Sequence, residues 1–358
     1  MTPQGKVNKR SYYLDIARGF AVFGMFTQHC MIVHEVSGGE GDSLLANLFV
    51  LLGTAPAAPV FMLLMGAFLI KSKASTRQNM WRGIKLLILG IILNLLRFTI
   101  PVLIAISLYG RDNLNLAEGE TLLTLLFAVD IFHLAGLSLI FCTLIKKITD
   151  QKNTIPLLIL TVLLASPFLW GRFSSNPFFD PFWGEANTIY FPFFPWIIYP
   201  LLGMYLSRYL LSGDRLKSSL RKMGWYGFAL SALGVVIFLL SAVGVLAFDI
   251  LSPTGDYYRS GASIHLLMIG FVLVWFSVCH WLEQTLSIEN RIIKVLIYWS
   301  KNVTAIYFVQ WVLFGWSMLL LDTNKLNAVD AALVGLIVLL LTHFSVKRAG
   351  VRKLFAWV

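Results

Sequence analysis

The residues best suited to chemistry lie in the first long apolar stretch of the chain, Tyr13–Glu35, which carries Asp15, Arg18 and His29. Ionisable side chains are costly in lipid and normally face a bundle interior or a watery cavity, so these three form a candidate site. Arg18 and His29 are eleven residues apart, close to three helical turns, so they share one helix face about 16 Å apart along the axis. That face would place a cation near one membrane surface and an imidazole, which transfers protons near neutral pH, in the other leaflet.

The composition predicts the class of protein that must position these groups. The 358 residues are 58% hydrophobic and only 13% charged, with a mean hydropathy of +0.75. Together with repeated apolar runs near twenty residues, these values predict an all-α polytopic membrane protein. The net charge of +11 is expected in cytoplasmic loops, so no nucleic-acid partner is predicted.

Neither a leader segment nor a cysteine site is expected. Thr2–Ser11 is polar, and the apolar run after it is too long for a cleavable signal peptide and has no small-residue cleavage site. The three cysteines, Cys30, Cys142 and Cys279, all lie inside apolar runs without a pairing pattern. They indicate neither a disulfide framework nor a metal site.

The apolar runs predict about ten membrane-spanning helices in a single bundle. Their expected ranges are Tyr13–Glu35, Leu44–Lys71, Trp81–Tyr109, Thr121–Lys146, Pro156–Gly171, Ile189–Leu211, Trp225–Phe248, Gly261–Trp281, Val295–Leu321 and Ala328–Val346.

One membrane domain is expected to fill residues 1–358, with short segments at 1–12 and 347–358 outside the membrane. Placing the N-terminus in the cytoplasm puts most of the 29 lysines and arginines in cytoplasmic segments. The even number of helices then predicts that both termini are cytoplasmic.

Further polar groups are expected inside the bundle. Asn94 and Arg97 are three residues apart on one helix face, and Asp130 and His133 have the same spacing on another. These groups could line a site. Alternatively, Asp130 and His133 satisfy each other, and Arg97 only neutralises Asp130 or Asp15.

An aromatic and proline-rich stretch, Arg172–Asn187, is expected in an exterior loop. Its rings could form an interfacial belt or a platform on which a sugar stacks.

Five segments resemble the transmembrane acyltransferases, a superfamily that includes acyltransferase family three and the heparan-α-glucosaminide N-acetyltransferase catalytic-domain family. The spacing Arg18-x10-His29 is similar to the characteristic motif of family three, whereas the order of the other segments resembles the second family more closely. The segments that carry the likeness are Leu14–Ala21, Ala57–Phe68, Asp130–Gly136, Phe193–Met204 and Trp299–Tyr307.

The resemblance implies transfer of an acyl group, with acetyl as the expected one, from cytoplasmic acyl-coenzyme A to an acceptor on the outer side. Coenzyme A is a polyanion with a long thin arm, so cationic side chains near the cytoplasmic face are expected to hold its phosphates. Residues expected to contact this donor are Arg18, Arg82, Lys85, Arg97, Asp130, His133, Lys301 and Asn302.

The catalytic residue is expected to be His29 or His34, with Asp15 nearby in the same helix. The sugar N-acetyltransferases place a histidine shortly after the first helix, a position that only His34 approaches, whereas family three has the spacing that leads to His29. We favour His29. It would act as a general base on the acceptor or accept the acyl group transiently.

Two other classes of function are compatible with the sequence. A polar track of Asp130, His133 and Arg97 could form the site of a secondary transporter, and the chain could be a non-catalytic partner in an envelope complex.

For the acyltransferase, the expected acceptor is a sugar or amino sugar of a glycan or envelope component. The expected location is the bacterial inner membrane, in contact with lipid, with a homodimer as a possible assembly.

Overall fold

A computed structural model describes residues 11–34, 44–54, 56–110, 120–148, 153–172, 178–211, 216–246, 257–321 and 326–357. Throughout these ranges the regular structure is helical, and the one extended pairing is an isolated bridge between Val129 and Ile189. Glu35, the expected end of the first helix, and most of the N-terminal segment 1–12 lie outside the described residues.

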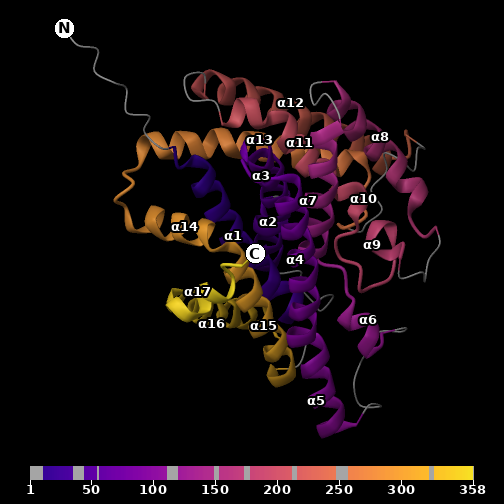
Figure 1. Ribbon diagram of the computed structural model, residues 1–358, viewed down its shortest axis with the longest axis vertical. Coiled ribbons are helices and arrows are strands. Elements are labelled where there is room, and N and C mark those ends of the chain that lie inside the picture. Colours follow the sequence, from indigo (N-terminus) through magenta and orange to yellow (C-terminus); the bar gives the residue numbers. More distant parts are fainter. Residues whose placement is uncertain are drawn as a thin grey trace.

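The helices follow one another along the chain as labelled in Figure 1. Their bounds are α1 Tyr13–His34, α2 Leu44–Thr54, α3 Ala57–Lys71, α4 Thr76–Asn94, η1 Leu95–Thr99, α5 Ile100–Tyr109, α6 Leu122–Leu126, α7 Ile131–Ile148, α8 Thr154–Leu169, α9 Asp180–Trp183, α10 Phe193–Trp196, α11 Ile198–Leu210, α12 Leu216–Ala242, α13 Ala262–Thr285, α14 Arg291–Lys301, α15 Val303–Leu321, α16 Ala328–Lys347 and α17 Ala349–Leu354.

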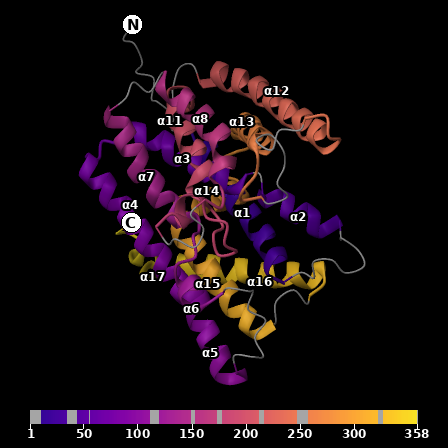
Figure 2. The same ribbon diagram turned by 90° about the vertical axis from the view of Figure 1, so that its right-hand side faces the viewer.

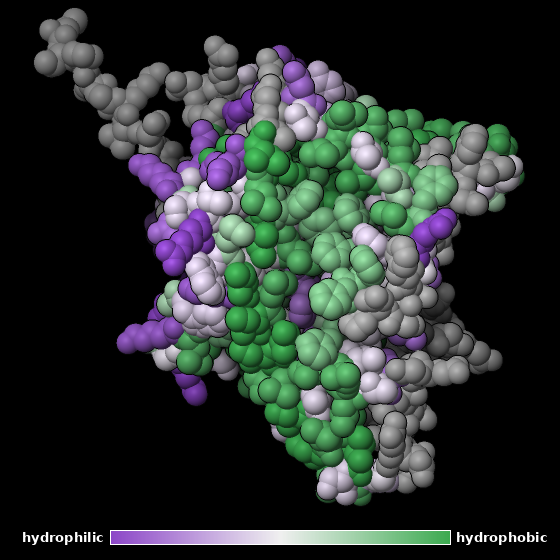
Figure 3. Space-filling view, turned by 45° about the vertical axis from the view of Figure 1, so that its right-hand side comes forward, coloured by the Kyte–Doolittle hydropathy of each residue, from purple (hydrophilic) through white to green (hydrophobic). Residues whose placement is uncertain are grey.

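The described part of the chain has 8 helical segments long and apolar enough to cross a membrane. The prediction of an all-α polytopic membrane protein is confirmed. Two further expected spans correspond to shorter helices, namely α8 with 16 residues and α11 with 13. The total of ten spans therefore stays a prediction. In Figure 3 a band of hydrophobic residues crosses the molecule, with hydrophilic side chains gathered along one side of it.

The helix ends meet in the pattern expected for alternating spans. At the start of α1, the Tyr12 N–H donates to the Glu283 carboxylate near the end of α13, and the Tyr13 hydroxyl donates to the Leu210 carbonyl at the end of α11. The Lys146 ammonium, near the end of α7, donates to the Leu69 carbonyl near the end of α3 at 2.9 Å. The first helix therefore begins on the side where α11 and α13 end, and α3 and α7 end together.

Small residues let two pairs of helices approach closely. A Cβ at Gly66 of α3 would lie 1.9 Å from the Pro200 carbonyl oxygen of α11, and one at Gly203 would lie 1.8 Å from the Leu63 carbonyl oxygen. Gly227 of α12 has the same relation to α13, and Figures 1 and 2 show α12 at the outer edge of the bundle. Packing through small residues replaces the hydrophobic effect between helices in lipid.

The expected span Thr121–Lys146 is interrupted, because residues between α6 and α7 pair with other parts of the chain. The Val129 N–H donates to the Thr188 carbonyl at 2.8 Å, and Asn94 Nδ2 donates to the Ala128 carbonyl at 2.7 Å. Non-helical backbone is tolerated inside a membrane bundle only where such partners satisfy its polar groups.

The expected span Val295–Leu321 is also divided. Asn302 leaves the helical conformation, with φ −119° and ψ 22°, so α14 ends at Lys301 and α15 begins at Val303. The first turn of α15 is thereby brought beside α1, where it takes part in the site described next.

Candidate active site

A cavity of about 1010 Å³ lies between α1, α3, η1, α5 and α15 and is lined mostly by apolar side chains. Arg18 and His29 both line it, at positions about 16 Å apart along α1. The shared helix face expected from their spacing therefore looks into one space. The tertiary structure adds α3, which supplies Phe61, Met65 and Phe68 to the opposite wall.

His29 is half-buried and held by α15. Its Nδ1 is hydrogen-bonded to Gln310 Nε2 at 3.0 Å, and its ring lies 4.3 Å from the Trp311 ring, centroid to centroid. An amide side chain can present either its nitrogen or its oxygen at such a distance. If the Gln310 oxygen accepts from Nδ1–H, the other ring nitrogen, Nε2, is left as the basic atom of His29.

His34 occupies a different environment. It is fully buried, and its Nε2 is hydrogen-bonded to Ser317 Oγ at 2.9 Å. It lines neither this cavity nor the second one described below. Of the two histidines considered from the sequence, His29 is the one placed where a substrate has room.

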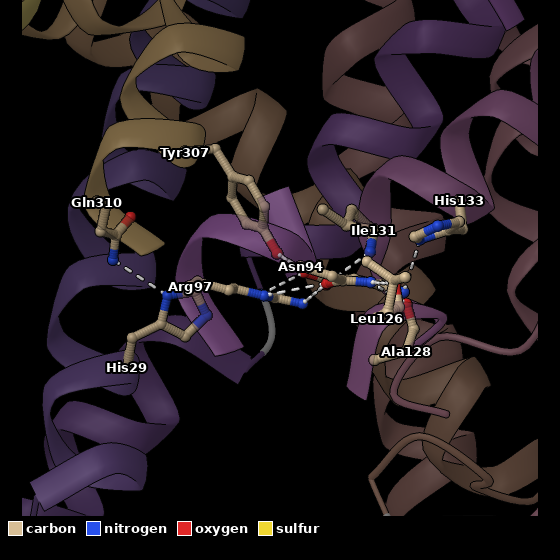
Figure 4. A network of polar contacts seen from close by, with 10 residues as sticks. His29, Asn94, Arg97, Leu126, Ala128, Ile131, His133, Tyr307 and Gln310 are labelled. Carbon is tan, nitrogen blue, oxygen red and sulfur yellow. Dashed lines mark hydrogen bonds and ion pairs between the residues drawn. The ribbon is translucent and has the colours of Figure 1, made fainter. Parts of the chain in front are cut away.

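A buried polar network joins η1, the start of α7 and α15 (Figure 4). Arg97 is 1% exposed and forms an ion pair with Asp130 at 2.6 Å. Its Nε and Nη2 donate to Asn94 Oδ1 at 3.2 and 2.8 Å, and the Tyr307 hydroxyl donates to Asp130 at 2.7 Å. A carboxylate and a guanidinium can share a dry interior only when paired and hydrogen-bonded in this way.

Local backbone geometry places Arg97 in this network. The α-helix widens into the π-helical turn η1 just before Pro101, which has no N–H to continue the ordinary ladder. Such turns are frequent at functional sites. The Arg97 guanidinium carbon lies 4.3 Å from the Phe98 ring centre and 4.8 Å from that of Trp311. Trp311 thus touches both Arg97 and His29.

The pairing of Arg97 with Asp130 corresponds to the neutralising role considered from the sequence, although both residues line the cavity. His133 is placed differently. Its Nδ1 accepts from the Asp130 backbone N–H at 3.2 Å, and its ring packs on Gly90 of α4. It does not line the cavity, and it caps the first turn of α7 instead.

The other expected donor contacts lie at the opposite end of α1. Arg18 reaches the Ser300 carbonyl at 3.5 Å and lies 5.1 Å from the Phe68 ring centre, while Asp15 accepts from the Ser300 hydroxyl at 2.8 Å. Asp15 is fourteen residues before His29, about 21 Å along the helix, so the two do not share a reaction centre. Lys301 and Asn302 line a second, adjoining cavity together with Asp15 and Arg18.

Arg82 and Lys85 line neither cavity. Arg82 is exposed on α4, and the Lys85 ammonium donates to the Trp357 carbonyl and lies 5.6 Å from its ring centre. Their position on α4 does not bring them to Arg18.

Four aromatic residues from the segments before α10 and α13 also line the main cavity. They are Tyr190, Phe191, Tyr257 and Tyr258. The Tyr257 hydroxyl donates to the Thr54 carbonyl at 2.8 Å, and burial raises the pKa of Tyr257 well above its usual value, so the phenol stays protonated.

Within the stretch Arg172–Asn187, the described residues, 172 and 178–187, do not contribute to that lining, and Phe173 lies outside the described residues. Phe179 and Trp183 stack on each other at 5.4 Å, and Phe178 is 84% exposed. The candidates for a ring platform along the cavity are therefore Tyr190, Phe191, Tyr257 and Tyr258, and not Phe179 or Trp183.

Sequence reasoning missed Trp311 and Ser300, which contact residues of the two cavities, and Ser317, which contacts His34 outside them. Trp311 is one more aromatic residue in an apolar run, and Ser300 and Ser317 are small polar residues without a recognisable pattern. Their roles arise from the approach of α14 and α15 to α1, which no local signal reports. Gln310, by contrast, is indicated by the sequence, because it is a polar side chain in the middle of an apolar helix.

Comparisons with known proteins agree with this geometry. The sequence model of a family described as the acyltransferase domain, acyltransferase family three, matches residues 11–345. No curated protein and no solved structure matches the chain. The match is to one of the two families that the sequence resembles, acyltransferase family three, whereas the closer likeness expected to the heparan-α-glucosaminide N-acetyltransferase family stays a prediction. Because the match covers nearly the whole chain, the protein belongs to the acyltransferase domain family and is a multi-pass membrane acyltransferase.

Proposed function

We propose that this acyltransferase moves an acyl group, acetyl in the simplest case, from cytoplasmic acyl-coenzyme A to an acceptor on the outer side of the membrane. The observation that carries the proposal is that Arg18 and His29 line one cavity at two depths. The donor's anionic end would stay near Arg18 while its thioester reaches His29. The spacing of about 16 Å between them suits the long pantetheine arm.

His29 then acts on the acceptor. Its Nε2 removes the proton from an acceptor hydroxyl or amine as that group attacks the thioester carbonyl, and coenzyme A leaves as the thiol. In a two-step route, Nε2 itself attacks the thioester carbonyl and expels coenzyme A as the thiolate. The acceptor then attacks the acyl-histidine, its proton passes to the thiolate, and the neutral imidazole is restored. Both routes require the Gln310 oxygen to accept from Nδ1–H.

Trp311 is the best candidate to stabilise the oxyanion. Its Nε1–H is buried and has no hydrogen-bond partner within the described structure, and its side chain lines the cavity beside His29. The Arg97 nitrogens, by contrast, are already engaged by Asn94 and Asp130. A donor fixed in a dry site stabilises developing negative charge without reorganisation.

The aromatic end of the cavity favours a sugar or amino sugar as the acceptor. Sugar rings stack on aromatic side chains, and Tyr190 and Tyr258 are among the aromatic residues that line the cavity. The resemblance to the heparan-α-glucosaminide N-acetyltransferases points in the same direction. A bacterial inner-membrane location, with the acceptor in the cell envelope, fits this assignment.

A transporter is less well supported. Asp130 is engaged by Arg97, by Tyr307 and by the Ile131 N–H, and His133 lies outside the cavity, so these residues are poorly arranged for a proton relay.

The experiment that tests the proposal follows release of the coenzyme A thiol from acetyl-coenzyme A by purified protein in the presence of amino-sugar and glycan acceptors. We expect His29→Ala to lower kcat by roughly 10²- to 10⁴-fold, the usual contribution of a general base, with little change in donor affinity. Arg18→Ala should weaken donor binding instead. Wild-type turnover by His29→Ala, or solute flux into liposomes without any acyl donor, would contradict the proposal.

A further inference from the structure

A second cavity of about 490 Å³ adjoins the main one at the start of α1. It lies between α1, the junction of α14 and α15, and the C-terminal segment 349–357. Arg18, Val303 and Thr304 line both cavities, so the two spaces meet at these residues. A volume of this size is within the usual range for small-molecule sites.

The lining of the second cavity is predominantly cationic. Arg18, Lys301 and Arg352 face it, and Asp15 is the one carboxylate among its lining residues. Asp15 is held by the Ser300 hydroxyl, whereas none of the three cations forms an ion pair within the described ranges. Three cations against one carboxylate favour an anionic ligand.

The backbone adds to this preference. The first three residues of α15, Val303, Thr304 and Ala305, also line the cavity. The first N–H groups of a helix have no partner within it, and the helix dipole is positive at this end. Phosphate groups commonly bind at such a position.

The C-terminal segment is held across the cavity by contacts on two sides. The Phe355 ring packs on Phe308 of α15 at 5.2 Å, and the Lys85 ammonium of α4 donates to the Trp357 carbonyl. Arg352 and Phe355 are thereby kept at the cavity wall. Both lie beyond residues 11–345, the part of the chain that the family model matches.

We propose that the second cavity binds the nucleotide end of the acyl donor, an adenosine carrying 3′-phosphate and 5′-diphosphate groups. Arg352 and Lys301 contact its phosphates together with the start of α15, and Phe355 offers an apolar face to the adenine. Arg18, which lines both cavities, lies where the nucleotide end joins the pantetheine arm. This inference rests on the proposed function, because it assigns the donor of that same reaction.

The direct test is calorimetric binding of adenosine 3′,5′-bisphosphate, which lacks the arm and the acyl group, to the full-length protein in neutral detergent. We expect Arg352→Ala to weaken this binding about tenfold or more, since a charge-assisted contact to phosphate is lost. The matched control is Lys353→Ala, which removes an equal charge from the neighbouring exposed position that does not line the cavity. Equal affinity of wild type and Arg352→Ala would overturn the inference.

Two further readouts separate the possible failures. In Arg352→Ala, the ratio of kcat/KM for acetyl-coenzyme A to that for S-acetylpantetheine, which lacks all phosphates, should fall about tenfold, while Lys353→Ala keeps the wild-type ratio. Absence of turnover with either donor would contradict the proposed function, yet the calorimetric comparison would still decide this inference. Binding of phosphatidylglycerol vesicles that depends on Arg352, without nucleotide binding, would overturn it in favour of a lipid headgroup site.

Discussion

Hydrogen bonding around His29 decides whether its imidazole can act as a base. Nδ1 faces Gln310, so the productive tautomer has its proton on Nδ1 and its lone pair on Nε2, and the Gln310 oxygen must accept that proton's hydrogen bond. Gln310 does not itself line the cavity. Its contribution is therefore to orient His29, in the way a carboxylate orients the histidine of a hydrolase triad.

Gln310→Leu should lower kcat roughly tenfold or more, because an imidazole without a fixed orientation loses part of the rate enhancement that a general base provides. KM for acetyl-coenzyme A should stay near the wild-type value, since the donor does not meet Gln310. Steady-state kinetics with a fixed acceptor measure both. An unchanged kcat would show that this hydrogen bond plays no part in the reaction.

The second histidine is expected to be structural. His34→Ala removes a fully buried imidazole and its hydrogen bond to the half-buried Ser317 hydroxyl, which should cost about 1–3 kcal/mol of folding free energy. The thermal unfolding midpoint should fall, whereas activity per folded molecule should remain within a few-fold of wild type. Loss of turnover in a protein that is still folded would move the catalytic role to His34.

At the scale of the elements, the breaks in the helices bring together the groups of the polar network and of the second cavity. The π-helical turn η1 and the interruption before α7 bring Arg97 and Asp130 together, and the break at Asn302 brings the first turn of α15 to the second cavity. The interruption before α7 and the break at Asn302 also free backbone groups for other parts of the chain, which the backbone of an unbroken helix does not do.

The pair that joins these elements should be essential for stability. Asp130→Asn leaves the Arg97 charge uncompensated in the interior and should cost about 3–5 kcal/mol, seen as a large fall in the thermal unfolding midpoint in detergent. Tyr307→Phe, which removes one hydrogen bond to the same carboxylate, should cost less. The double variant Arg97→Gln/Asp130→Asn should recover part of the loss. Wild-type stability of Asp130→Asn alone would show that the pair does not hold the elements together.

At the scale of the whole molecule, the two cavities extend from the side where α1 begins, past His29, to Ile32 and Val33 near its other end. Asp15 at the start of α1 and Arg352 of α17 line the same cavity, so the first helix begins on the side where the C-terminal segment lies. This arrangement fits the expected common side of the two termini. That this side is cytoplasmic remains a prediction from the charge distribution.

Cysteine labelling in intact cells tests the orientation. The native thiols Cys30, Cys142 and Cys279 are at most 1% exposed, so the unmodified chain should react little and serves as the background. Phe178→Cys should be labelled by a membrane-impermeant maleimide from outside, whereas Lys353→Cys should react only after the cytoplasmic side is opened. Labelling of Lys353→Cys in intact cells would invert the topology and the donor path with it.

The amino-acid sequence by itself determined the all-helical membrane class and the shared face of Arg18 and His29, because hydropathy and the helical period are local properties. It also indicated Asn94, Arg97 and Asp130 as buried polar groups. Only the tertiary structure decided their partners: Arg97 pairs with Asp130, His133 caps a helix outside the cavity, and Arg82 and Lys85 lie apart from Arg18. The physical reason is that charge compensation, cavity lining and helix breaks depend on which helices pack together, and those contacts join residues far apart in the chain.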